Sequence, residues 1–219
     1  MAGMEEYLCA TPCMDTESPA IQAFTREAVG DATTDVDRAI RLFYAVRDGI
    51  RYNPYSFGID PALFVASAVL ERKESFCIPK AILLATAARV VGIPSRLNFA
   101  DVRNHLSSPR ALDILKTDVF SFHGSTELYL GGRWIKVTPA FNRTLCEKMN
   151  VAPLDFDGEN EAIFQPFDAG GNQFMDYIHD HGSFADLPYQ QMVASFHHHY
   201  PHLFGAEAPV IEGDMESEV

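Results

Sequence analysis

The sequence predicts an α+β domain in which helices come first and an antiparallel sheet follows. Apolar residues recur at helical spacing through the first part of the chain, up to Val91. After Val91 the spacing of apolar residues changes to the alternation that is typical of strands. Two alternating segments then flank Gly131-Gly132, which indicates a tight β-hairpin. We therefore expect a buried helix packed on an antiparallel sheet.

The first half of the chain contains a series of predicted helices. Ser18-Pro19 supplies an N-cap and a first-turn proline for a helix that Gly30 ends. A second helix is expected over 35–49, because its apolar residues lie on one side. An extended turn follows at 50–54, since a residue before proline avoids the helical region. Residues 62–70 are expected to form a short helix.

The strongest helical signal begins at Cys77 and runs to Val91. Most residues there are good helix formers and nearly all are apolar, so the helix should be buried. Pro79 is tolerated only in a first turn, which places the helix start at or just before Cys77. Gly92-Ile93-Pro94 then ends the helix with a glycine followed by a proline.

The second half of the chain supplies the predicted sheet. Strands are expected where apolar and polar residues alternate, at 95–102, 126–130 and 133–137. We expect a loop that includes one helical turn at 103–120, a second loop at 150–175, and a late helix at 188–199. We place one domain at 1–205 and expect the acidic residues 206–219 to be a disordered tail.

The composition argues against several classes of function. The chain of 219 residues carries 30 acidic and 17 basic side chains, a formal net charge of −13. Such a surface repels phosphate, so we expect neither nucleic acid nor a membrane among the partners. No segment is long and apolar enough to span a bilayer, and the acidic N-terminus leads into no signal-peptide core. We therefore expect a cytoplasmic protein, whose four cysteines fit a reducing compartment.

A cysteine and a distant histidine carry the strongest chemical signal. Cys77 is at a helix start, where free N–H groups and the helix dipole favour a thiolate and can hold an oxyanion. Counting back across the hairpin places His123 on the same face as Thr138, one diagonal step away. A base oriented by a partner on the next strand is the arrangement of a catalytic triad. The structural alternatives are a buried core cysteine and a strand-end histidine that caps a turn.

Two blocks of sequence resemble the transglutaminase-like superfamily. Residues 76–96 are similar to its cysteine helix, and residues 123–139 are similar to its histidine hairpin. The spacing and the flanking residues agree in both blocks, and the resemblance covers most of 18–200. It implies a papain-like α+β fold with a Cys-His-Asp triad, in which Cys77 is the nucleophile and His123 is the base.

The third triad member departs from the pattern of the superfamily. The aspartate expected after the tryptophan strand is Thr138 here. A threonine can accept a hydrogen bond from imidazole but cannot stabilise imidazolium by charge. We choose Asp101 as the third member, because it ends the strand that follows the cysteine helix. In the alternative, Cys77 and His123 work as a dyad, and Thr138 tunes His123. Asn142 is a weaker candidate for the third member, and Asp118 is weaker still.

The predicted function is cysteine-dependent acyl transfer through a thioester. The partner would be a substrate with an amide or a thioester, including one held on a carrier protein, and the acyl group would pass to water, an amine or an internal carbanion. Some bacterial relatives release polyketide–peptide chains by Dieckmann cyclisation. Such a cyclase is the second hypothesis, which long apolar loops at 57–66 and 162–178 would favour. A non-catalytic binding scaffold is the third.

No cofactor and no metal site are expected. Adjacent helical residues point in different directions, so at most two of the histidines around 197–199 could share a metal ion. We therefore expect a solvated helix end there. The acidic residues of 155–159 lack the spacing of a calcium loop. Cys9 and Cys13 have no further ligands nearby, so a structural or incidental role is expected.

Overall fold

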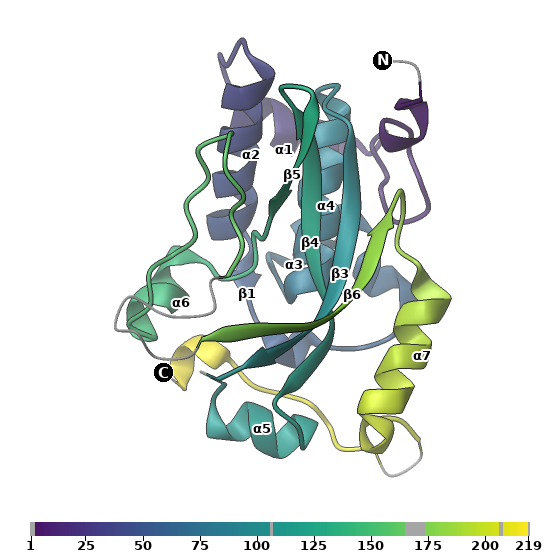
Figure 1. Ribbon diagram of the computed structural model, residues 1–219, viewed down its shortest axis with the longest axis vertical. Helices are drawn as coiled ribbons and strands as arrows, with labels where there is room; N and C mark the ends of the chain where they lie inside the picture. The colour runs from purple at the N-terminus through teal and green to yellow at the C-terminus, as the bar shows by residue number, and fades with distance from the viewer. Residues whose placement is uncertain (1–2, 106, 165–173, 206–207, 219) are drawn as a thin grey trace.

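The computed structural model describes residues 3–105, 107–164, 174–205 and 208–218. An antiparallel sheet lies at its centre, with the strand order β5-β4-β3-β6. The long helix α4 (Cys77–Val90) runs behind β3 and β4 in Figure 1, and α2 (Asp35–Gly49) lies beside it. The predicted α+β fold, with the cysteine helix packed on the sheet, is therefore confirmed.

The centre of the sheet is one hairpin and the strand beside it. β4 (Val119–Leu130) and β5 (Arg133–Val137) form the hairpin, and β3 (Ser95–Asn104) pairs with β4 on its other side. Gly131 and Gly132 turn the hairpin with φ values of 58° and 87°. Glycine adopts such positive values without steric cost, which is why this pair specifies the turn. All three predicted strands are present, although β4 begins earlier than expected.

The edge strand β6 (Met175–Phe184) pairs with β3, and the sequence did not predict it. Most of its residues are exposed or half-buried. The strand is rich in histidine, aspartate and glycine, so apolar and polar residues do not alternate along it as they do in a half-buried strand. Of the loop expected at 150–175, residues 150–164 contain no regular helix or extended strand, and 165–173 lie outside the described residues.

The other α-helices of the described chain are α1 (Pro19–Val29), α3 (Ala66–Arg72), α5 (Pro109–Leu115), α6 (Arg143–Lys148) and α7 (Tyr189–His199). α5 lies in a segment that we expected to be a loop. Ser108 caps it by accepting a hydrogen bond from the backbone N–H of Ala111 at 3.1 Å. The short helix expected at 62–70 is divided into a 3-10 turn over Pro61–Phe64 and α3.

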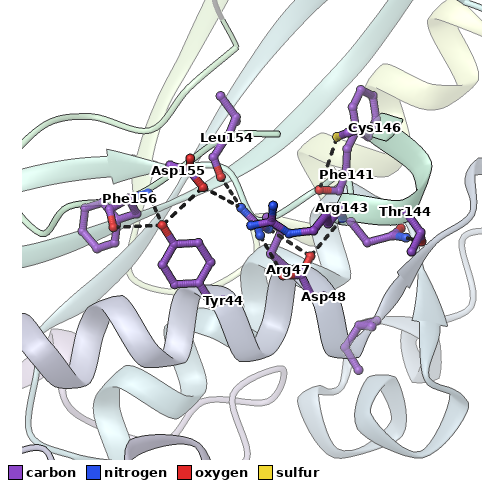
Figure 2. A network of polar contacts seen from close by, with 12 residues as sticks. Tyr44, Arg47, Asp48, Phe141, Arg143, Thr144, Cys146, Leu154, Asp155 and Phe156 are labelled. Atoms are coloured by element: carbon purple, nitrogen blue, oxygen red, sulfur yellow. Dashed lines mark hydrogen bonds and ion pairs between the residues drawn. The ribbon is translucent and has the colours of Figure 1, made fainter. Parts of the chain in front are cut away.

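A buried arginine ties the end of α2 to two later segments (Figure 2). Arg47 Nη1 donates to the Leu154 carbonyl at 2.5 Å, and Nη2 pairs with Asp48 at 2.7 Å. Asp48 also accepts a hydrogen bond from the backbone N–H of Arg143 at 2.9 Å, at the start of α6. A guanidinium can be buried when its donors are satisfied in this way. The short strand β1 (Arg51–Tyr52) then pairs with β2 (Glu74–Ser75), which leads directly into α4.

α4 also buries a lysine against the end of α2. Lys80 is fully buried, and its ammonium donates to the backbone carbonyls of Arg47, at 2.9 Å, and of Ile50. Burial lowers the pKa of Lys80 to about 7. These contacts fix the first turn of α4, and with it Cys77, to the end of α2.

The C-terminal segment 208–218, where we predicted an acidic disordered tail, makes ion pairs with the domain. Asp214 pairs with Arg51 at 2.7 Å, and Glu218 pairs with Arg110 at 2.9 Å. Composition alone did not reveal that basic side chains from distant parts of the chain would meet the acidic ones.

Candidate active site

Cys77 is the first residue of α4, and its sulfur lies beside backbone N–H groups. Hydrogen bonds from Gly124, Ile78 and Cys77 itself favour the charged form of the sulfur. Burial opposes them and is the larger effect, so the pKa of the Cys77 thiol is raised to about 11. The cysteine is therefore a neutral thiol, held where an anion would find donors as it forms.

The strand beside Cys77 comes this close because Gly124 has no side chain. A Cβ atom at this position would lie 2.9 Å from the Cα of Ile78 in α4. Any other residue would push β4 away from the start of α4. Gly124 thus brings its own N–H to the sulfur and places its neighbour His123 at the same end of the helix.

His123 lies on β4, opposite Ala100, and is 7% exposed. Its Nε2 atom is enclosed and has no hydrogen-bond partner among the described residues. Burial lowers the pKa of the imidazole to about 4. The ring of Phe164 lies 5.8 Å away, between ring centroids. His123 is therefore a neutral imidazole in an apolar setting, able to take up a proton.

Thr138 follows β5, and its hydroxyl is the second unsatisfied buried group near this end of the sheet. The register pairs Thr126 with Val137, so its continuation sets Thr138 opposite Ser125, two residues from His123. Within the described residues, Thr138 Oγ1 has no hydrogen-bond partner. The predicted register of the hairpin is confirmed, but no hydrogen bond joins Thr138 to His123.

Within the described residues, the hydrogen bonds of Asp101, our choice as the third triad member, go to residues other than His123. Asp101 Oδ1 accepts hydrogen bonds from Ser121 Oγ and the Phe122 N–H, both at 2.9 Å, and contacts His181 Nε2 at 2.8 Å. Burial would raise the pKa of Asp101, but His181 and the other donors hold it below its usual value. A β-bulge in β3 around Asp101 interrupts the alternation that we counted on.

The two weaker candidates are engaged elsewhere as well. Asn142 accepts a hydrogen bond from the backbone N–H of Tyr52 at 2.8 Å. Asp118 pairs with Arg103 at 2.9 Å. Neither makes a hydrogen bond to His123 within the part of the chain that the structure describes.

Cys77 and His123 both line one cavity beside the start of α4. Its other walls come from the segment after β1, from α5, from the end of α7 and from the C-terminal segment. Among them are Phe57, Ile114, Leu115, Phe196, Tyr200 and Ile211. The cavity therefore has a nucleophile and a base at one end and apolar side chains around the rest.

Sequence reasoning missed Tyr52 and Tyr200. Both line the cavity, and the Cys77 thiolate charge, after the larger effect of burial, raises the pKa of Tyr52. Tyr200 OH accepts from the Ser121 N–H at 2.6 Å and donates to the Val119 carbonyl at 2.9 Å. No local pattern marks either residue, because only the tertiary fold brings them to Cys77.

Comparison with known proteins identifies the family of the chain. The family model of the transglutaminase-like superfamily matches residues 22–139, which is more than half of the chain. The chain belongs to the transglutaminase-like superfamily. The match includes both Cys77 and His123, and no curated protein matches the chain. Membership supports a cysteine-dependent enzyme in general.

A solved structure shares the superfamily fold. It is the crystal structure of a putative cysteine protease from Cytophaga hutchinsonii, with a TM-score of 0.55 and 14% sequence identity. The match covers 88% of this chain and 50% of the other, so the chain spans half the length of that protein. At this identity the likeness shows the fold alone, and the transglutaminase-like, papain-like fold that the resemblance implied is confirmed.

Within the described residues, no helix is long and apolar enough to cross a bilayer. In the same residues, no group of three or more histidine, cysteine, aspartate or glutamate side chains is arranged to hold a metal ion. His197 and His198 are exposed at the end of α7, and His199 Nδ1 lies 3.0 Å from the Ser195 carbonyl.

Proposed function

We propose that this protein is a cysteine-dependent acyl-transfer enzyme that forms a thioester on Cys77. The observation that carries the proposal is the meeting of Cys77, three backbone N–H groups and His123 at one end of a single cavity. A binding scaffold would have no need to hold a thiol between anion-stabilising donors and a base.

The first step converts the neutral pair into an acyl-enzyme. The sulfur of Cys77 attacks the substrate carbonyl while the thiol proton passes to His123. Nε2 is the enclosed nitrogen of His123, so Nδ1 is the one that takes the proton. Backbone N–H groups beside Cys77, with the hydroxyl of Tyr52, hold the oxyanion that forms. The leaving group receives the proton from His123 as its bond to carbon breaks.

Deacylation completes the reaction and decides its outcome. An acceptor nucleophile attacks the thioester, gives its proton to His123 and releases Cys77, which recovers its proton. Water gives hydrolysis and an amine gives transfer. Both outcomes use the same residues, so the geometry around Cys77 serves either acceptor.

The apolar cavity favours a Dieckmann-type cyclase as the second candidate function. In that reaction a carbanion of the acyl chain itself attacks the thioester, and a cavity that admits little water protects the intermediate. Phe57, from the first of the two loops that we expected to favour a cyclase, lines the cavity. Of the second loop, residues 165–173 lie outside the described residues.

Acylation by p-nitrophenyl acetate tests the proposed thioester. We expect a burst of p-nitrophenolate and one acetyl group on Cys77 by mass spectrometry. Cys77→Ser should abolish both, and His123→Ala should slow acylation by about 10²-fold or more, as is typical of a general base. Cys9→Ser, which alters an exposed cysteine, is the matched control and should react like the wild type. Acylation that persists in Cys77→Ser, or an unchanged rate in His123→Ala, contradicts the proposal.

A further inference from the structure

We propose that the cavity beside Cys77 binds the acyl group of the substrate, and that this group is an apolar aliphatic or aromatic chain. A glutamine side chain or another polar acyl group would not suit it. The inference rests on the proposed thioester chemistry, because it concerns the group that Cys77 would carry.

Apart from that of Tyr52, the hydroxyl groups along the cavity are already hydrogen-bonded within the protein. Tyr200 OH is shared between two backbone groups of β4, at 2.6 and 2.9 Å. Ser121 Oγ donates to Asp101 at 2.9 Å, and Tyr55 OH donates to Glu218. None of the described lining residues is an aspartate, glutamate, lysine or arginine. A polar acyl group would find few free partners along these walls.

Polar groups available to a substrate are gathered at the reacting end. Cys77 and His123 lie there, together with Tyr52, whose hydroxyl makes no hydrogen bond within the described residues. This asymmetry matches a molecule with one carbonyl head and an apolar body. The carbonyl would lie among the donors and the chain would fill the rest.

Most of the described walls of the cavity are aromatic or aliphatic. The ring of Phe57 lies 4.8 Å from that of Phe196 and 5.9 Å from those of Phe76 and Tyr200, between centroids. Ile114 of α5 closes another side. Burying a polar amide here would cost its hydrogen bonds to water, whereas an apolar chain gains from leaving water.

A series of p-nitrophenyl esters tests the chemical class of the acyl group. In each reaction the S–C bond of the thioester forms, the C–O bond to p-nitrophenolate breaks, and the thiol proton goes to His123. From acetyl to octanoyl, the second-order acylation rate of Cys77 should rise by about fourfold per methylene until the cavity is filled. A hexanoyl chain that ends in a carboxamide should lose most of that gain. Equal rates for all chains would overturn the inference.

Two substitutions on α5 provide a matched pair. Ile114 lines the cavity, whereas Leu112 is 37% exposed and does not line it. Ile114→Asn should lower the octanoyl-to-acetyl rate ratio by about tenfold, because a polar group then lies in the apolar wall. Leu112→Asn should keep the wild-type ratio. Equal ratios in both variants would place the chain outside this cavity.

A binding measurement separates the acyl site from the chemistry. Cys77→Ser should bind one equivalent of a polyene fatty acid, whose fluorescence rises in an apolar site, and adding Ile114→Asn should weaken that binding. If no ester acylates Cys77 while the fatty acid still binds, the thioester proposal fails and the apolar site stands. If the fatty acid does not bind, the inference fails whatever the esters show.

Discussion

At the scale of single residues, the candidate site contains two buried polar atoms without partners, His123 Nε2 and Thr138 Oγ1. Each unsatisfied buried group costs about 1–3 kcal/mol. For Nδ1 of His123 to act as the base, Nε2 must carry the hydrogen. The Thr138 oxygen, one diagonal step across the hairpin, is then the acceptor best placed to meet it.

Substitution of Thr138 tests this pairing. Thr138→Val keeps the shape of the side chain but removes the acceptor, so acylation of Cys77 should fall by about tenfold. Thr138→Ser keeps a hydroxyl and should stay near the wild-type rate. The measurement is the p-nitrophenyl acetate burst, with urea unfolding to show that both variants are folded. A wild-type rate in Thr138→Val would mean that the threonine does not hold the tautomer of His123.

At the scale of elements, the pairing of β3 with β4 places the base. Phe122 has a φ of 58°, a left-handed conformation that is costly for a bulky residue. Asp101 holds it there by accepting the Phe122 N–H, and it also fixes Ser121. His181, from β6, completes the group at 2.8 Å. We propose that Asp101 is a positioning residue, which acts on His123 through the backbone of β4.

Two variants of Asp101 separate positioning from direct catalysis. Asp101→Asn keeps an acceptor for Phe122 but removes the charge, so acylation should stay within about threefold of the wild type. Asp101→Ala removes every hydrogen bond of the carboxylate, and the free energy of unfolding should fall by about 3 kcal/mol. Urea unfolding and the burst rate measure the two effects. A loss of about 10³-fold in Asp101→Asn, without loss of stability, would return Asp101 to a direct catalytic role.

Elements with a strong local signal were predictable, and elements made by tertiary contacts were not. α4 was predicted because proline, glycine and apolar residues agree on its bounds. The hairpin was predicted because Gly131-Gly132 lies between two alternating segments, a pattern that indicates a tight turn. β6 and the ion-paired segment 208–218 were missed. Their residues are polar, and they are held by pairing with β3 and by ion pairs to distant arginines. Such partners are invisible in a local window of sequence.

At the scale of the whole molecule, the same distinction explains the site. Cys77 and His123 were found because a helix start and a hairpin register are local patterns. The hydrogen bonds of Asp101 could not be foreseen because a bulge in β3 interrupts the strand alternation, and the cavity was unforeseen because its walls come from separate segments. The fold that brings these segments together also removes water from the nucleophile and base. Burial of these two groups therefore makes the stability of the protein depend on pH.

Burial of His123 makes stability depend on pH in a predictable direction. Its pKa is about 4 in the folded protein and 6.5 in its ordinary state, so the unfolded chain binds more protons between these values. Stability is then fully present above pH 6.5 and is lost as pH falls toward 4. The full difference is worth roughly 3 kcal/mol. Cys77 acts in the opposite sense, because its raised pKa removes stability as pH rises above 9.

Urea unfolding of wild type and His123→Asn, at several values between pH 4 and 7.5, measures the histidine contribution. The wild type should lose more free energy of unfolding than the variant over this range, by up to roughly 3 kcal/mol. Other titrating groups, including Lys80, are common to both proteins and cancel in the comparison. The pH slope is the informative quantity, since any constant loss of stability in the variant does not alter it. Parallel curves would show that His123 titrates alike in the folded and unfolded states, and the apolar, water-poor environment proposed for Cys77 would then be untenable.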